Sequence, residues 1–270
     1  MRIQNSIRFG EQEMKLLFAL EQSEQGTFTI KDAKRILGTS SASVKNVLKR
    51  LKRKKRLIPL QKGAYLYAPL KSGRNGKWSE DAFKIVRLLA NTDRHYIGFV
   101  TAMSHWGMTE QIPYVMFVAL ERQKREVKAV QTRFQFVKVK KLGEFEKVQI
   151  GGVDVNISTI EQTIIDGLAH PKYCAGIDSV TKAIAYSEKR MNWEKLISMA
   201  MEGKSVIRRR LGYLLELLGL KKYAKKLEGK FTGYSFLEAS AQKGNFSYSK
   251  KWGLKVNVEK DDLLEFQRGF

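Results

Sequence analysis

Residues 29–68 read TIKDAKRILGTSSASVKNVLKRLKRKKRLIPLQKGAYLYA, and this stretch predicts two short helices separated by a tight turn. Thr29 can cap the first helix, because a threonine hydroxyl accepts a hydrogen bond from a backbone N–H group of the first turn. Gly38 then supplies a turn, which a helix interior would resist. Ser40 is a second capping residue, so we expect the second helix to begin at Ser41.

The second helix has one apolar face and one basic face. Apolar residues recur at helical spacing and would pack against a core, namely Val44, Val47, Leu48 and Leu51. The second helix of a helix-turn-helix places its polar face in the major groove of DNA. We therefore predict that this face binds DNA through its polar residues, Ser41, Ser43, Lys45, Asn46, Lys49, Arg50 and Arg53.

The chemistry of these side chains separates two roles. Asn46 and Arg50 can form bidentate pairs with adenine and guanine, respectively, and together with Ser43 they are the predicted base contacts. Contacts to phosphate fix the register of a protein on the duplex without selecting a base. The predicted phosphate contacts of this helix are Lys45, Lys49 and Arg53.

A hairpin with a basic tip follows the second helix. Residues 57–60 and 64–67 predict two strands, and Lys62 in the turn between them is expected to touch phosphate. Before residue 22, apolar residues recur at helical spacing. This pattern predicts an earlier helix, which would complete a three-helix core. Residues 8–70 are therefore predicted to form a winged helix-turn-helix domain. Residues 71–77, which are polar and basic and contain two glycines, would link it to the rest of the chain.

Residues 78–270 are expected to form a second, larger domain. Helical periodicity lies at residues 82–89, 96–108, 158–168, 178–189, 192–202 and 205–219. Strand patterns lie at residues 115–119, 134–139, 148–157 and 252–258, the third as a hairpin about Gly151-Gly152. The chain is thus predicted to be α+β, with an N-terminal winged helix-turn-helix and a mixed α/β C-terminal domain that has a small sheet and several helices.

Polar residues and prolines indicate where several of these helices begin and end. Ser158, with Glu161 three residues later, resembles a capping box. Asp178 and Asn192 are expected to cap the next two helices. Pro113 is expected to end the helical segment that precedes it.

The chain carries a large excess of positive charge. Fifty Lys and Arg residues oppose 27 Asp and Glu residues, which gives a net charge of +23. Lys45 to Arg56 contains eight basic residues and no acidic one. Double-stranded DNA is the predicted partner, because clustered cations release counterions from phosphate, and the alternative is a solvated helix face. No apolar run is long enough to cross a membrane and no signal-peptide core is present, so we expect no membrane partner and a cytoplasmic location.

A second basic run lies far along the chain. Arg208, Arg209 and Arg210 begin a predicted helix, and we expect at least one of them to face outward. They would form a secondary basic patch for phosphate or for an acidic protein. The alternative is again a solvated helix face.

The sequence holds no coherent catalytic or metal-binding motif. Three histidines lack the spacing of a metal site, and the single cysteine, Cys174, excludes an intrachain disulfide. No glycine-rich phosphate loop occurs, so nucleotide phosphates have no binding loop, and we expect neither a metal nor another cofactor. Asp154, Glu161 and Asp166 could approach one another, but we favour structural roles for them.

Three blocks of the second region resemble one known family. The first block contains YIGFVTA at 96–102, HWGMT at 105–109 and QIP at 111–113. The second and third blocks are STIEQTIID at 158–166, followed by Pro171, and RLGYLLE at 210–216. In this order, and behind a DNA-binding domain, the blocks resemble the AbiEi-type antitoxins of AbiE abortive-infection systems over nearly the whole chain.

The resemblance implies a function. Members of this family repress their own toxin–antitoxin operon by binding operator repeats, and their partner toxin resembles a nucleotidyltransferase. We therefore expect a transcriptional autoregulator and antitoxin of this phage-defence type, which binds its operator as a two-fold symmetric homodimer. The resemblance brings no catalytic residue. The alternatives are a DNA-directed enzyme, either a base-excising glycosylase or an abasic-site lyase, and a protein that coats DNA without sequence preference.

Overall fold

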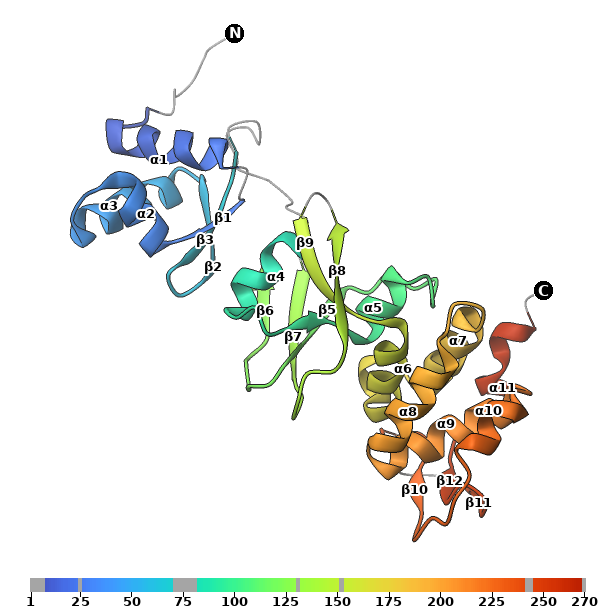
Figure 1. Cartoon of the computed structure of the whole chain (residues 1–270). Helices are drawn as coiled ribbons and strands as arrows, with labels where there is room; N and C mark the ends of the chain where they lie inside the picture. Colours follow the sequence, from blue (N-terminus) through green and yellow to red (C-terminus); the bar gives the residue numbers. More distant parts are fainter. Residues whose placement is uncertain are drawn as a thin grey trace. The chain divides into compact units, whose positions relative to one another are not determined.

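A computed structural model of the protein describes residues 8–23, 26–69, 82–129, 132–150, 153–240 and 245–268 (Figure 1). The described chain combines helices with several small sheets, which confirms the predicted α+β fold class. It divides into two compact units, one from Met1–Asp93, Arg125–Gln135 and Gln149–Val155, the other from Arg94–Lys124, Phe136–Val148 and Asn156–Phe270. The linker predicted at residues 71–77 lies outside the described residues, and the predicted domains 8–70 and 78–270 stay predictions.

The N-terminal part has the order of elements of a winged helix-turn-helix. Its helices are α1 (Glu11–Gln22), α2 (Ile30–Leu37) and α3 (Ser41–Arg53), and its strands are β1 (Thr27–Thr29), β2 (Leu57–Gln61) and β3 (Ala64–Tyr67). The strands form an antiparallel sheet in the order β1-β3-β2. Strand β1 is not apparent in the sequence pattern, because three residues are too few to show alternation and owe their order to pairing with β3.

The capping residues of α2 and α3 act as the sequence predicts. The Thr29 side chain accepts a hydrogen bond from the backbone N–H of Asp32, and the Ser40 side chain accepts one from that of Ser43. Between the two helices Gly38 adopts a left-handed conformation with a φ of 64°. A glycine adopts this conformation without steric cost, so it permits the sharp turn.

The apolar face of α3 is buried as predicted. The side chains on this face are each at most 3 % exposed: Val44, Val47, Leu48 and Leu51. They share one core with Leu16, Leu17 and Leu20 of α1 and with Phe28 of β1. Burial of each such side chain contributes about 1.5–3 kcal/mol, which fixes the rotation of α3 about its axis and therefore which face meets solvent.

The middle of the chain contains a mixed sheet in the order β6-β7-β5-β4-β9-β8. Its strands are β4 (Tyr96–Ile97), β5 (Val115–Leu120), β6 (Val127–Ala129), β7 (Thr132–Lys138), β8 (Phe145–Ile150) and β9 (Val153–Ser158). Helix α4 (Ala82–Ala90) precedes it. Strands β8 and β9 are neighbours, as the predicted hairpin requires, and the turn at Gly151-Gly152 lies outside the described residues.

The helix predicted over residues 96–108 is only partly correct. Tyr96 and Ile97 form β4, which pairs antiparallel with β5 and parallel with β9. Helix α5 (Phe99–His105) is short, and Gly107 follows it in a left-handed conformation with a φ of 62°. The chain therefore leaves the helix well before Pro113, and the prediction that this proline ends the helix is wrong.

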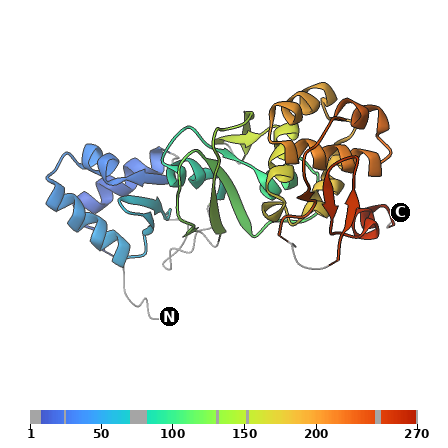
Figure 2. The ribbon, with the colours of Figure 1, turned by 90° about the horizontal axis from the view of Figure 1, so that it is seen from below.

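The rest of the chain is mainly helical. Its helices are α6 (Ile160–Ala169), α7 (Ile177–Ser187), α8 (Trp193–Glu202), α9 (Ser205–Leu217), α10 (Lys221–Lys226) and α11 (Lys260–Leu263). Helix α6 contacts α5, α7, α8 and α9, and most of its residues are buried. Figure 2 shows the helices coloured yellow to orange packed together beside a small red sheet. This sheet has the order β10-β12-β11 and consists of β10 (Ser235–Phe236), β11 (Ser247–Ser249) and β12 (Leu254–Val256).

The cap of α6 lies one residue later than predicted. Thr159 accepts a hydrogen bond from the backbone N–H of Gln162. Ser158 is instead the last residue of β9, and its hydroxyl oxygen lies 2.7 Å from that of Thr163. The prediction that Ser158 and Glu161 form a capping box is therefore wrong.

The cap predicted for α7 is also wrong, whereas that for α8 is confirmed. Helix α7 begins after Gly176, and Asp178 lies inside it. Glu238 accepts a 2.9 Å hydrogen bond from the backbone N–H of Ile177, a contact between distant segments that no local pattern contains. Asn192 caps α8 by accepting a hydrogen bond from a backbone N–H of its first turn.

Candidate functional site

The residues predicted to contact DNA lie on α3 and in the hairpin turn. Exposed side chains project from α3 at Ser41, Lys45, Asn46, Lys49, Arg50 and Arg53. Lys62 is exposed between β2 and β3. Ser43 is half-buried, and its backbone N–H donates to the cap residue of the helix. Helix α3 contains no acidic residue, so its solvent face carries a net positive charge, which favours an anionic partner.

A buried carboxylate fixes α3 against α1. Glu13 of α1 is 1 % exposed, and its Oε1 accepts a 2.9 Å hydrogen bond from Nε of Arg50. The Lys54 ammonium group and the Gly10 N–H both donate to Oε2. Burial raises the pKa of Glu13, but the hydrogen bonds from Lys54, Gly10 and Arg50 outweigh it, so the pKa lies below its ordinary value. Sequence analysis misses this residue, although a glutamate early in a helix is a common capping signal.

This contact divides the basic face of α3 into two parts. Arg50 and Lys54 are one helical turn apart and lie on the side of α3 that faces α1. In the part of the chain that the structure describes, Lys45 and Lys49 have no carboxylate within ion-pair distance. Together with Ser41, Asn46 and Arg53, which are also exposed, they remain available to a ligand.

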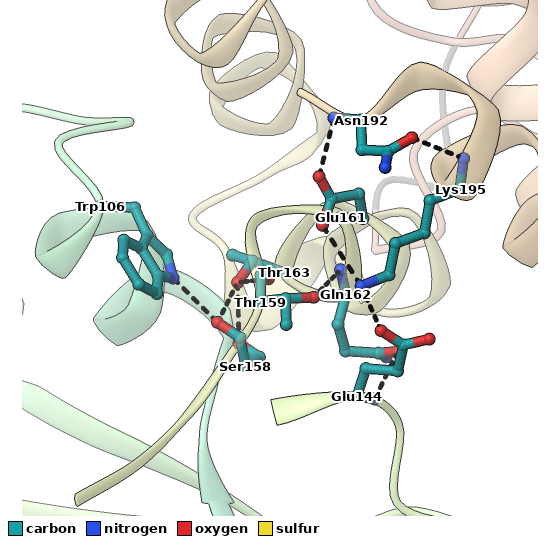
Figure 3. A network of polar contacts seen from close by, with 9 residues as sticks. All are labelled: Trp106, Glu144, Ser158, Thr159, Glu161, Gln162, Thr163, Asn192 and Lys195. Carbon is teal, nitrogen blue, oxygen red and sulfur yellow. Dashed lines mark hydrogen bonds and ion pairs between the residues drawn. The ribbon is translucent and has the colours of Figure 1, made fainter. Parts of the chain in front are cut away.

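Polar contacts hold the start of α6 in the second unit (Figure 3). Nε1 of Trp106 donates a 2.8 Å hydrogen bond to the carbonyl oxygen of Ser158. Glu161 accepts a 2.9 Å hydrogen bond from the backbone N–H of Asn192, and its carboxylate lies 3.9 Å from Nζ of Lys195. Glu161 therefore stabilises the start of α8 rather than that of its own helix. The contacts join α6 to α8 and to the turn after α5.

Another carboxylate of α6 is buried among neutral partners. Asp166 accepts a 2.8 Å hydrogen bond from the Tyr96 hydroxyl and a 2.7 Å hydrogen bond from Nε2 of Gln162. Burial raises the pKa of Asp166 to about 7, although both hydrogen bonds lower it. Burial and the charge of Asp166 in turn raise the pKa of Tyr96. Because Asp166 is only 7 % exposed, a macromolecular substrate does not reach it.

The candidate catalytic groups do not form one site. Asp154 is exposed on β9, whereas Glu161 and Asp166 each have the partners described above. Among the described residues, no group of three His, Cys, Asp or Glu side chains could hold a metal ion. Cys174 is buried, and burial raises the pKa of its thiol well above the ordinary value. A thiol in this state is a poor nucleophile.

The predicted basic patch at Arg208, Arg209 and Arg210 is wrong. The exposed fractions of Arg209 and Arg210 are 6 % and 3 %. Their guanidinium groups donate to the backbone carbonyl groups of Leu168, Thr232, Gly233, Phe236 and Gly253. Arg208 donates in the same way to those of Leu227 and Glu228. These arginines hold the end of α6 and the segments that follow α9, and they do not form a surface for a ligand.

Together, the capped turn, the basic helix and the hairpin define a winged helix-turn-helix fold, which is the fold of many DNA-binding transcriptional regulators. Residues 15–68 match the family described as "Transcriptional regulator, AbiEi antitoxin". Residues 96–217 match the family described as "AbiEi antitoxin C-terminal domain". The chain belongs to the AbiEi antitoxins, as its sequence blocks indicate.

The fold is similar to that of a solved structure across nearly the whole chain. The crystal structure of the RV2827C protein from Mycobacterium tuberculosis matches with a TM-score of 0.73 and 14 % sequence identity, and the match covers 97 % of each chain. At this identity the likeness shows the fold alone. Comparison with curated proteins gives no match. Within the described residues, every helix is too short or too polar to cross a membrane.

Proposed function

We propose that this protein is an autoregulator and antitoxin that represses the operon encoding itself and a nucleotidyltransferase-like toxin. The solvent face of α3 carries the proposal, because Lys45, Asn46 and Lys49 project from it and the helix has no acidic residue. Membership of the AbiEi antitoxins supports the antitoxin part. We place its action in the cytoplasm, where operator DNA is accessible.

In this proposal α3 lies in the major groove and the hairpin lies against the adjacent backbone. Base edges would be contacted by Ser43, Asn46 and Arg50, and phosphate by Ser41, Lys45, Lys49, Arg53 and Lys62. Asn46 is the strongest candidate for a base contact. Its amide is exposed, whereas Ser43 is half-buried and Arg50 is held by Glu13.

The second unit would supply the surface that neutralises the toxin, and two copies of the chain would bind a two-fold repeated operator. Its match to the antitoxin C-terminal family supports this division of labour. The contacts of Figure 3 support it further, because they hold α5, α6 and α8 in one rigid arrangement. Rigid elements present a binding surface more accurately than loops do.

Mobility-shift assays with DNA from upstream of the gene and with scrambled DNA test the DNA-binding part. Asn46→Ala should reduce the free energy of binding to the upstream DNA by roughly 1–3 kcal/mol and relax discrimination at one base pair. Lys62→Ala should weaken binding to both DNAs by the same factor. Lys222→Ala removes an exposed lysine of α10 and should change neither. Equal losses of Asn46→Ala on both DNAs would contradict the assignment, and cleaved or heat-labile strands on a denaturing gel would favour the enzyme alternative.

Co-expression with the neighbouring toxin gene tests the antitoxin part. The full-length triple variant Lys45→Ala, Asn46→Ala, Lys49→Ala should lose repression of a reporter fused to the upstream DNA. It should still relieve growth inhibition by the toxin, because its second unit is unchanged. A variant that loses both activities while remaining folded would show that neutralisation depends on α3.

A further inference from the structure

Aromatic rings surround a lysine on the exposed side of the C-terminal sheet. Phe236 of β10 and Tyr248 of β11 are both register partners of Lys255 on β12. Register partners on neighbouring strands point to the same face of a sheet. Tyr234 and Phe246 each lie two residues before one of these aromatics, so alternation places them on the same face. We refer to these five residues as the aromatic–lysine face.

Contacts between the side chains support this arrangement. The ring centroids of Tyr234 and Tyr248 are 4.8 Å apart, and those of Phe246 and Tyr248 are 5.4 Å apart. Nζ of Lys255 lies 5.1 Å from the ring centroids of both Phe236 and Phe246. Tyr234, Phe246 and Tyr248 nevertheless remain 46 %, 37 % and 57 % exposed. Contiguous exposed apolar patches mark interaction surfaces, whereas single exposed rings are ordinary.

A hollow of about 460 Å³ opens on this face, and it is lined by Tyr234, Tyr248, Lys250 and Lys255. In the described part of the chain, neither lysine has a carboxylate within ion-pair distance. The adjacent Lys251, by contrast, pairs with two glutamates. The two lysines of the hollow therefore keep their positive charge available to a ligand.

Negative charge is absent from the segments that form this sheet. Residues 229–237 and 245–258 contain no Asp or Glu. Three acidic residues border these segments. Glu238 is 6 % exposed, and its carboxylate accepts hydrogen bonds from the N–H groups of Ile177 and Ser240. Glu228 pairs with Lys251, and Glu259 is exposed after β12. The face thus combines rings with uncompensated positive charge. Single-stranded nucleic acid has the complementary chemistry, since its bases stack on aromatic side chains and its phosphates attract lysine, whereas a duplex hides its base faces.

We propose that the aromatic–lysine face binds single-stranded RNA. Bases would stack on Tyr234 and Tyr248, and phosphates would lie near Lys250 and Lys255. Among the described residues, neither tyrosine hydroxyl has a hydrogen-bond partner, so both can bond to a ribose 2′-hydroxyl, which DNA lacks. The face lies beyond residue 217, outside the segments that match the antitoxin families, and is distinct from the DNA-binding face of α3.

Fluorescence anisotropy with a short labelled oligo(A) RNA tests the proposal on the full-length protein. Excess unlabelled duplex DNA occupies α3, so the signal reports binding elsewhere. The double variant Tyr234→Ser, Tyr248→Ser should lose affinity roughly tenfold or more, as expected for removal of stacking platforms. Tyr114→Ser is the matched control, because Tyr114 is 93 % exposed in another segment, and it should bind as the wild type does. Unchanged affinity in the double variant would overturn the proposal.

Two further variants separate the parts of the proposal. Tyr248→Phe keeps the ring and removes only the hydroxyl, so it should retain binding of oligo(dA) and reduce the preference for RNA. Lys250→Ala should weaken RNA binding and reduce its dependence on salt. A wild-type protein that binds oligo(dA) as tightly as oligo(A) would overturn the choice of RNA. Loss of binding to anionic lipid vesicles, without loss of RNA binding, in the same variants would instead identify a membrane surface.

Discussion

Glu13 shows how a single residue orients helix α3. We expect Glu13→Gln to lower the free energy of opening of α1 and α3 by about 1–3 kcal/mol at neutral pH, because the amide carries no charge for Arg50 and Lys54. The pKa of Glu13 in the folded protein lies below its ordinary value of 4.5. The stabilisation that the Glu13 carboxylate provides is therefore fully present above pH 4.5, and it is lost as the pH falls through the folded-state pKa. Hydrogen exchange of the α1 and α3 amides at neutral and at acidic pH measures it. A deficit of equal size at both pH values would contradict the prediction.

Asp166 has the opposite dependence on pH. Its pKa of about 7 exceeds the ordinary 3.8, so the folded protein holds a proton that the unfolded chain releases. The free energy of unfolding should then fall as the pH rises between these values, by up to about 4 kcal/mol. Asp166→Asn should remove this dependence and be the more stable protein in mildly alkaline solution. Urea unfolding of both proteins across this range measures the effect. If the free energy of unfolding of the wild type rises over the same pH range, the predicted effect of Asp166 is wrong.

At the scale of residues, the sequence predicts what neighbours along the chain determine. Thr29, Gly38 and Ser40 act as expected, because each contacts groups within one helical turn. Contacts between distant segments carry no such signal. The carboxylates of Glu13 and Glu238 bind partners on other elements, and local sequence patterns do not predict these contacts.

At the scale of elements, helix α9 and the C-terminal sheet depend on one close approach. A Cβ atom on Gly212 would lie 2.1 Å from the ring of Trp252, which is fully buried and donates to Glu216. Gly212→Ala must therefore displace the tryptophan, and we expect a loss of about 1–3 kcal/mol. Thermal unfolding measures the loss, and near-ultraviolet circular dichroism reports the displaced ring. Lys222→Ala on the neighbouring helix is the control, and an unchanged melting temperature in Gly212→Ala would contradict the close contact.

Length decides which elements are predictable from the sequence. Helices α3, α6, α8 and α9 span enough residues to show their period, whereas β1, β4, β6 and β10 have two or three residues each. Such strands owe their existence to pairing, which local sequence does not record. The aromatic–lysine face is missed for the same reason. Its signal in the sequence is the alternation of Phe246 and Tyr248 with serine, over a stretch too short to stand out.

At the scale of the whole molecule, the net charge of +23 predicts how binding to duplex DNA responds to salt. Affinity for any DNA should fall steeply between about 50 and 200 mM salt, and Lys62→Ala should reduce the slope by roughly one if this lysine neutralises one phosphate. Arg209 and Arg210 are buried, so their substitution should not change the slope. Titration of upstream and scrambled DNA at several salt concentrations measures both. A slope unaffected by Lys62→Ala would show that the hairpin does not contact phosphate.

The burial of Cys174 makes the protein suitable for labelling at one chosen position. The only native thiol is buried and protonated at neutral pH, so maleimide reagents do not reach it in the folded state. A cysteine introduced by Lys62→Cys would then be the one that reacts, without prior removal of the native residue. A fluorophore at this position would report the approach of the hairpin to DNA by energy transfer, in the otherwise unaltered chain.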